Sequence, residues 1–230
     1  MTNRENTVRH QPAGATPMRV GPVLVATVLV VCALVFVALV RQVWDGGSVA
    51  FDESVMLWMH SVSTPWLTDV AQAVTHLGGR IVQVVAVAIA VVLCARRRWA
   101  DALIVVAAVV GSSRINVTLK PIIERARPDY WEHMTVEPTY SFPSGHTMAA
   151  MSIAVPLVIL AWNSRYRWPT LAVAAVYTFA VGASRVYLGV HFPSDVLAGW
   201  CLTGLWVAVV VVVVRYLARR VRRGGQLSEE

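Results

Sequence analysis

Two ionisable residues in the C-terminal half of the chain have the spacing of a nucleophile and its partner. Asp195 follows His191 by four residues, so its carboxylate can accept the Nδ1–H of the imidazole. That hydrogen bond would select one tautomer of the ring and leave Nε2 able to attack an electrophile. His146 is the second candidate, because a protonated imidazole can donate a proton to a leaving oxygen. His191, His146 and Asp195 are therefore the candidate catalytic residues.

The cations near these histidines in sequence favour an anionic ligand. Lys120, the only lysine of the chain, precedes Arg127 by seven residues, so on a helix the two side chains would share a face. Arg185 adds a third cation, and guanidinium groups bind phosphate oxygens through paired N–H donors. Ser144 and Gly145 precede a predicted helix, whose first turn offers free backbone N–H groups to an anion. These five residues predict a phosphate site without a metal ion.

The composition indicates that lipid surrounds the elements which position these residues. Hydrophobic residues make up 57% of the 230 residues and charged residues 14%, against about 45–50% and about 25% in ordinary globular proteins. Disordered chains are far more polar than this. The three cysteines, Cys32, Cys94 and Cys201, lie far apart in apolar runs, which excludes a disulfide scaffold. The formal charge is +7, but the basic residues cluster between apolar runs, so nucleic acid is not an expected partner.

Six apolar stretches approach the length of about 20 residues that a membrane-spanning helix needs. The second begins at residue 81 or earlier, near Leu67, and the second, fourth and fifth are shorter than ideal. The stretches are residues 21–40, 81–95, 100–119, 147–162, 169–183 and 196–214. They predict an all-α fold, a polytopic membrane helical bundle with six transmembrane helices.

The distribution of basic residues predicts how this bundle is oriented. Six spans place both chain ends on one side of the membrane, and the tails and loops on that side hold 13 of the 20 Lys and Arg residues. Because cytoplasmic segments are rich in Lys and Arg, both termini are predicted in the cytoplasm. The polar clusters that hold the candidate site residues, at residues 120–128, 142–147 and 184–195, are then predicted at the outer face. The predicted organisation is a cytoplasmic tail (1–20), a membrane domain (21–215) that includes an outer interfacial segment (51–79), and a basic cytoplasmic tail (216–230).

The polar clusters together resemble the signature of the type-2 phosphatidic acid phosphatase superfamily, which also contains vanadium haloperoxidases and glucose-6-phosphatase-like enzymes. That signature reads K-x6-R-P, then P-S-G-H, then S-R-x5-H-x3-D. Its positions are filled here by Lys120, Arg127, Pro128, Pro143, Ser144, Gly145, His146, Ser184, Arg185, His191 and Asp195. The resemblance covers roughly residues 81–214, and the first apolar stretch matches the family layout only in outline.

The resemblance implies hydrolysis of a phosphate ester or anhydride through a phosphohistidine on His191, without metal or cofactor. His146 would protonate the leaving group, and Asp195 would orient His191. The substrate implied is a lipid phosphate or pyrophosphate, either phosphatidic-acid-like or a polyprenyl pyrophosphate such as undecaprenyl pyrophosphate, in a bacterial plasma membrane. The oligomeric state stays open. The phosphoryl oxygens would be held by Lys120, Arg127, Ser144, Gly145 and Arg185.

Other interpretations of the same residues remain open. Vanadate-dependent halide oxidation would use the same anion site, although the resembling haloperoxidases are larger and soluble. A transporter of anionic lipid, or an inactive relative that binds without turnover, would also carry buried charges. Lys120 could instead pair with Glu124 one helical turn later. For Arg125, interfacial anchoring or helix pairing is favoured over a catalytic role.

Overall fold

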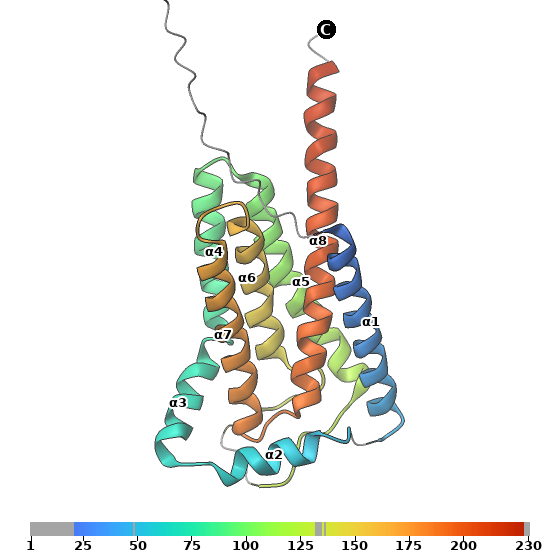
Figure 1. The fold of residues 1–230 in the computed structure, drawn as a ribbon, viewed down its shortest axis with the longest axis vertical. Coiled ribbons are helices and arrows are strands. Elements are labelled where there is room, and N and C mark those ends of the chain that lie inside the picture. Colours follow the sequence, from blue (N-terminus) through green and yellow to red (C-terminus); the bar gives the residue numbers. More distant parts are fainter. Residues whose placement is uncertain (1–20, 48, 132–134, 136, 228–230) are drawn as a thin grey trace, which may run out of the picture.

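The computed structural model describes residues 21–47, 49–131, 135 and 137–227, with side chains as far as residue 221. Throughout these residues the regular structure is helical, without a strand (Figure 1). Among the described residues there are eight helices, which are α1 (Pro22–Trp44), α2 (Asp52–Ser61), α3 (Pro65–His76), α4 (Arg80–Ala95), α5 (Trp99–Ile123), α6 (Gly145–Ala161), α7 (Arg167–Tyr187) and α8 (Pro193–Leu227). The predicted tail over residues 1–20 lies outside the described residues.

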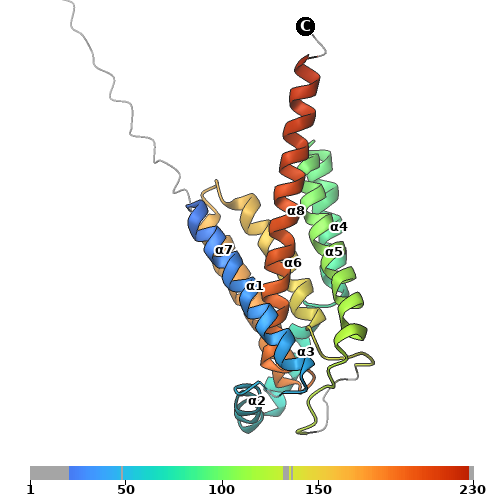
Figure 2. The ribbon, with the colours of Figure 1, turned by 90° about the vertical axis from the view of Figure 1, so that its right-hand side faces the viewer.

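Helix α6 forms the centre of the bundle and packs against α5, α7 and α8. Around it, α1 packs on α8 and α4 on α5, and all six run along the long axis of the molecule (Figures 1 and 2). The two short helices lie at one end, where α2 crosses the end and α3 packs against α7. The start of α1 and the end of α8 point to the opposite end. The predicted polar segment 51–79 thus folds as two short helices and the turns beside them.

In the part of the chain that the structure describes, four helices are long and apolar enough to cross a membrane, namely α1, α5, α7 and α8. The count rises to five if α3 and α4, which meet at a 41° bend, are taken as one span. Helix α6 is apolar but has only 17 residues. An all-helical membrane bundle is therefore established, while the predicted number of six spans exceeds what helix length and composition alone support.

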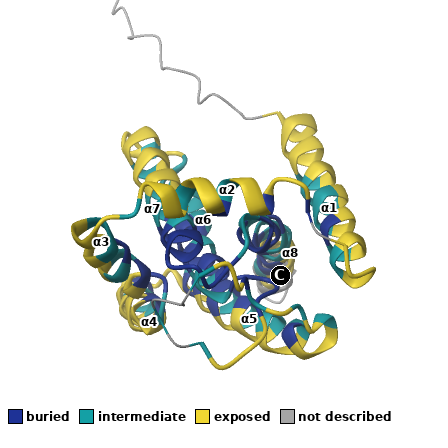
Figure 3. Cartoon of the chain, turned by 90° about the horizontal axis from the view of Figure 1, so that it is seen from below, coloured by how far each residue is buried: buried dark blue, intermediate teal, exposed yellow. Residues whose placement is uncertain are grey.

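Small and branched side chains fill the contact between α4, α5 and α6, with Val82, Ala86, Val105 and Ile153 among the buried residues. The outward faces carry large apolar side chains that nothing covers, as Figure 3 shows for the rim of the bundle. Val84, for example, is 70% exposed. A soluble monomer rarely leaves such continuous apolar surface in water, so this rim is the lipid-facing surface.

Two helix ends differ from the prediction and change how the site is built. Helix α5 continues through Pro121 and ends where Glu124 adopts a left-handed conformation with φ of 54°. The chain turns there, so Lys120 and Arg127 do not share the face of one helix as their spacing predicted. Helix α7 extends to Tyr187, so Arg185 lies in its last turn rather than in a connecting segment. Helix α8 likewise runs beyond the predicted end at residue 214.

A close contact between α5 and α8 gives a stability prediction. A Cβ added to Gly111 would lie 2.2 Å from Cζ2 of Trp206, whose indole N–H donates to the carbonyl of Ala107 at 3.1 Å. We expect Gly111→Ala to destabilise the protein by about 1–3 kcal/mol, because the ring has to shift. The measurement is thermal unfolding in detergent.

The matched control is Gly204→Ala on α8, where an added Cβ meets nothing within 4 Å. That change should be neutral or stabilising by up to about 1 kcal/mol, because alanine favours the helix over glycine. Equal melting temperatures for the two variants would contradict the packing argument.

Candidate active site

His191 lies in the turn between α7 and α8, and Asp195 lies in the first turn of α8, which begins at Pro193. Nδ1 of His191 is 3.3 Å from Oδ2 of Asp195, and both side chains are buried. The same carboxylate oxygen accepts the backbone N–H of Phe192 at 2.9 Å. The i,i+4 spacing therefore produces the contact that was predicted from it, with Nε2 of the imidazole turned away from the carboxylate.

Arg127 faces the other nitrogen of this ring. Its Nη1 lies 3.4 Å from Nε2 of His191 and donates to the carbonyl of Val190 at 2.6 Å. Burial, followed by the charges of Arg185 and Arg127, holds the pKa of His191 well below its ordinary value. The imidazole is therefore neutral at pH 7, with a free lone pair at Nε2 beside a guanidinium group.

Arg185 is fully buried at the end of α7 and faces the same region. Its Nη1 donates to Oγ1 of Thr75 at 2.8 Å, and its Nη2 pairs with Oε1 of Glu137. The other oxygen of Glu137 lies 3.8 Å from Nη2 of Arg127. Burial raises the pKa of Glu137, but the charge and hydrogen bond of Arg185, together with the charges of His146 and Arg127, lower the pKa overall. An ionised carboxylate thus lies between two guanidinium groups.

Lys120 reaches the same segment from the last turn of α5. Its Nζ donates to Oγ1 of Thr139 at 2.8 Å, while the carbonyl of Thr139 accepts Nε of Arg127 at 2.8 Å. Thr139 therefore brings together two cations that the end of the helix separates. Glu124 accepts the hydroxyl of Tyr140 at 3.2 Å. The structure thus gives Lys120 and Glu124 different partners, in place of the alternative pairing.

Ser144 is the N-cap of α6 and is fully buried. Its backbone N–H donates to the carbonyl of Asp195 at 3.1 Å, and its Oγ accepts the hydroxyl of Thr147 at 2.9 Å. A Cβ on Gly145 would lie 2.9 Å from Oδ1 of Asn116, so glycine lets the helix start pack closely on α5. The next N–H groups of this first turn lack intrahelical acceptors and can donate to an anion.

His146 follows in the first turn of α6 and lines a cavity of about 250 Å³. The glycine turn between α3 and α4 lies beside it, since a Cβ on Gly79 would be 3.6 Å from Nε2 of the imidazole. Lys120, Glu137 and Asn116 line both this cavity and a larger one of about 720 Å³. The predicted acid and Lys120 therefore border the smaller cavity, while Lys120 and Arg127 border the larger one.

Two ionised residues of this region were not assigned to it from the sequence. Arg125 donates to Oδ2 of Asp52 at 2.8 Å and to Oγ of Ser194 at 2.7 Å, and also to Oδ1 of Asp195. It therefore pairs the starts of α2 and α8, as the helix-pairing interpretation predicted, and it also contacts the carboxylate that faces Nδ1 of His191. Glu137 was likewise missed. Neither residue falls on a motif position, and nothing local in the sequence marks its partners.

The apolar helical bundle brings together a neutral histidine, its carboxylate partner and three cations at one end. This combination is typical of a membrane enzyme that acts on a phosphate group. Comparison with known proteins agrees. The family model described as the PAP2 superfamily matches residues 101–219. The chain belongs to the PAP2 superfamily and is a phosphatase of this metal-independent type. In the described part of the chain, no group of three or more His, Cys, Asp or Glu side chains is placed to hold a metal ion.

Individual relatives carry related phosphatase names. Phosphatidylglycerophosphatase B of Bacillus subtilis is 35% identical over 160 residues, which cover 66% of this chain and 77% of the relative. Undecaprenyl-diphosphatase of Sulfolobus acidocaldarius is 36% identical over 113 residues, 48% of this chain and 50% of the relative. The crystal structure of a transmembrane PAP2-type phosphatidylglycerolphosphate phosphatase from Bacillus subtilis is similar with a TM-score of 0.71 and 31% identity, over 84% of this chain and 96% of that one.

Proposed function

We propose that this protein hydrolyses a lipid phosphate or diphosphate at the outer face of a bacterial plasma membrane, through a phosphohistidine on His191. The observation that carries the proposal is the pair of contacts to one ring. Asp195 lies at Nδ1 of His191, and a guanidinium nitrogen of Arg127 lies 3.4 Å from Nε2. A phosphoryl group bound by that guanidinium would lie directly in front of the attacking nitrogen.

The reaction has two balanced steps. In the first, Nε2 of His191 forms a bond to phosphorus while the bond from phosphorus to the lipid oxygen breaks, and His146 gives its proton to that oxygen. In the second, His146 takes a proton from water, the water oxygen attacks phosphorus, and the phosphorus–nitrogen bond breaks to release phosphate. Arg127 and Arg185 stabilise the charge on the equatorial oxygens throughout. Lys120, the hydroxyl of Ser144 and the backbone N–H of Gly145 complete the donors.

Glu137 has a direct consequence for binding. Its carboxylate accepts a hydrogen bond from Arg185 and lies 3.8 Å from a guanidinium nitrogen of Arg127. A phosphoryl group carries more charge and one more oxygen than a carboxylate, so it can take over these donors. Substrate binding then releases the carboxylate from at least one guanidinium group.

The arrangement of the bundle favours a lipid over a soluble ester. The site residues belong to the ends of α5 and α7, the starts of α6 and α8 and the segments beside them, and large apolar side chains such as Trp58 and Trp66 are exposed on α2 and α3 at that end. A lipid can present its phosphate there while its chains stay in the hydrocarbon. The topology we propose has six spans, with α4 and α6 as short spans, the membrane domain at residues 21–215, and both tails in the cytoplasm.

The test is a panel of phosphatidylglycerol phosphate, phosphatidic acid and undecaprenyl diphosphate, with a water-soluble alkyl phosphate for comparison, all assayed in EDTA. We expect kcat/KM for at least one lipid to exceed that for the soluble ester by about tenfold or more, because binding energy from the lipid stabilises the transition state. Intact spheroplasts that carry the protein should release phosphate from a short-chain lipid phosphate added outside. Absence of phosphate release from every lipid, or release only after the spheroplasts are lysed, would contradict the proposal.

A further inference from the structure

The start of α2 is joined to the start of α8 by buried polar contacts. Asp52 is only 3% exposed. Its Oδ1 accepts the backbone N–H of Ser194 at 2.9 Å, and its Oδ2 accepts the hydroxyl of the same residue at 2.5 Å. Residues 142 positions apart in the chain are thus held together one residue before Asp195. Asp52 also lies outside the segment that the family model matches, residues 101–219.

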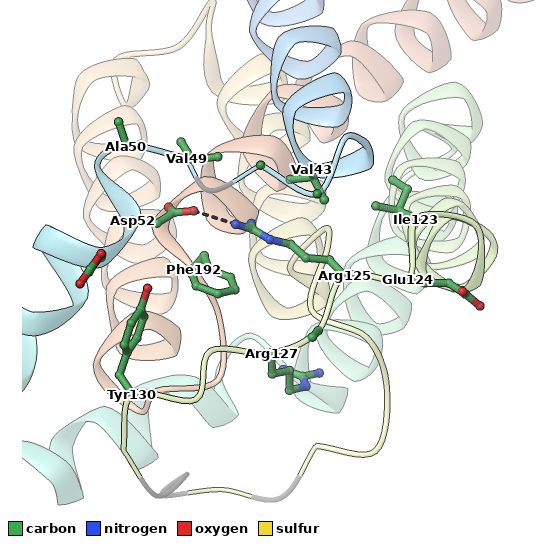
Figure 4. Close-up of a pocket in the computed structure, with 14 residues that line it drawn as sticks. Val43, Val49, Ala50, Asp52, Ile123, Glu124, Arg125, Arg127, Tyr130 and Phe192 are labelled. Carbon is green, nitrogen blue, oxygen red and sulfur yellow. Dashed lines mark hydrogen bonds and ion pairs between the residues drawn. The ribbon is translucent and has the colours of Figure 1, made fainter.

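Arg125 links this joint to the catalytic carboxylate. Figure 4 shows its side chain reaching from the segment after α5 to Asp52, with the ring of Phe192 nearby. The guanidinium carbon lies 4.0 Å from the centroid of that ring. The two oxygens of Asp195 therefore have different partners. Oδ1 accepts a hydrogen bond from Arg125, while Oδ2 faces Nδ1 of His191.

We propose that Asp52 and Arg125 are positioning residues that keep Asp195 ionised and aimed at His191. This inference rests on the proposed role of His191 as the nucleophile. A buried carboxylate without a cation takes up a proton, and a protonated Asp195 would no longer hold the tautomer that frees Nε2. Asp52 in turn fixes the guanidinium group, since a second carboxylate and the ring of Phe192 leave it one orientation.

The charges predict an order of effects. Without Arg125, two buried carboxylates, Asp52 and Asp195, lie on either side of Ser194, and one of them has to be neutralised. Without Asp52, the pair of Arg125 and Asp195 remains and only its orientation is loosened. Removing Arg125 together with the charge of Asp52 relieves the repulsion between the carboxylates of Asp52 and Asp195. The double variant should therefore be more active than the variant that lacks Arg125 alone.

The pH dependence follows from the groups that face Asp195. Loss of Arg125 removes the cation nearest to the carboxylate of Asp195 and so favours its protonated form, and the acid limb of the kcat profile should therefore move to higher pH. Four other charged or titratable groups lie around Asp195. They are His191 in the turn before α8, Arg127 in the segment after α5, Lys120 on α5 and Asp52 on α2.

The experiment compares Arg125→Met, Asp52→Asn and the double variant with the parent protein, using phosphatidic acid in mixed micelles across pH 5 to pH 9. We expect kcat to fall about 100-fold in Arg125→Met and about tenfold in Asp52→Asn, with KM changed much less. The double variant should recover activity relative to Arg125→Met. Glu53→Gln is the matched control, because Glu53 is the exposed neighbour of Asp52 on α2 and should leave kcat unchanged.

The inference is wrong if the acid limb of the kcat profile does not move in Arg125→Met and the losses of the two single variants simply add in the double variant. Packing alone would then explain the losses. If Arg125→Met does not fold, the pH profiles of Arg125→Lys and Asp52→Asn decide the question in the same way. His191→Ala separates the two proposals. If it stays active, the proposed function is wrong; if it is inactive while Asp52→Asn matches the parent, only the positioning roles are wrong.

Discussion

His191→Asn should reduce kcat by about 10⁴-fold or more, the largest effect expected of any single substitution in this protein. The asparagine amide can still donate to Asp195, whose Oδ2 lies 3.3 Å from Nδ1 of the imidazole. The variant therefore keeps the buried hydrogen bond and loses only the attacking Nε2. The measurement is release of phosphate from a lipid phosphate by the purified variant, together with trapping of an acid-labile phosphoenzyme from labelled substrate.

The matched control is His60→Ala. His60 is exposed on α2 and stacks on Trp131 with ring centroids 4.4 Å apart. Its loss should leave kcat and the labelled intermediate unchanged. A His191→Asn protein that melts at the parent temperature and still yields labelled phosphoenzyme would show that another residue is the nucleophile.

For His146→Ala, the size of the loss should depend on the leaving group. With an alkyl lipid phosphate, we expect kcat to fall by about 10²–10⁴-fold, because the departing alkoxide needs a proton. With an aryl phosphate such as p-nitrophenyl phosphate, the loss should be small, because that oxygen leaves without protonation. The measurement is the ratio of kcat on the two substrates, compared between the variant and the parent.

The control for this series is His76→Ala. His76 is the exposed last residue of α3, and its carbonyl lies beside the same glycine turn as His146. Its removal should change neither rate. An equal loss on both substrates in His146→Ala would mean that His146 binds the phosphoryl group or supports the fold, and would exclude its role as the general acid.

Much of the site could be predicted from the sequence because its determinants are local. Asp195 contacts His191 because it follows four residues later and because α8 starts at Pro193. Together these place the carboxylate 3.3 Å from Nδ1 of the imidazole. Ser144 lies at the N-cap position of α6, directly before the helix that the apolar stretch predicted. Both features depend on residues less than two helical turns apart, so spacing was sufficient to predict them.

The predicted placement of Lys120 and Arg127 on one face of a helix is wrong. Their spacing predicted a shared helix face, but the left-handed Glu124 ends α5 between them. Lys120 and Arg127 still converge, because both bind Thr139 in the segment that returns toward α6. Helical periodicity describes a residue only as far as the helix continues, and the sequence alone did not locate this end.

The chain's composition and motifs by themselves determined that this is an all-helical membrane protein of the PAP2 superfamily, with its polar clusters at one end of the bundle. Only the tertiary structure decided that Arg125 contacts both Asp52 and Asp195, and that Glu137 lies between Arg127 and Arg185. The physical reason is distance along the chain. Arg125 meets partners 73 and 70 residues away, and a charge buried beside such a partner has no signature in the residues next to it.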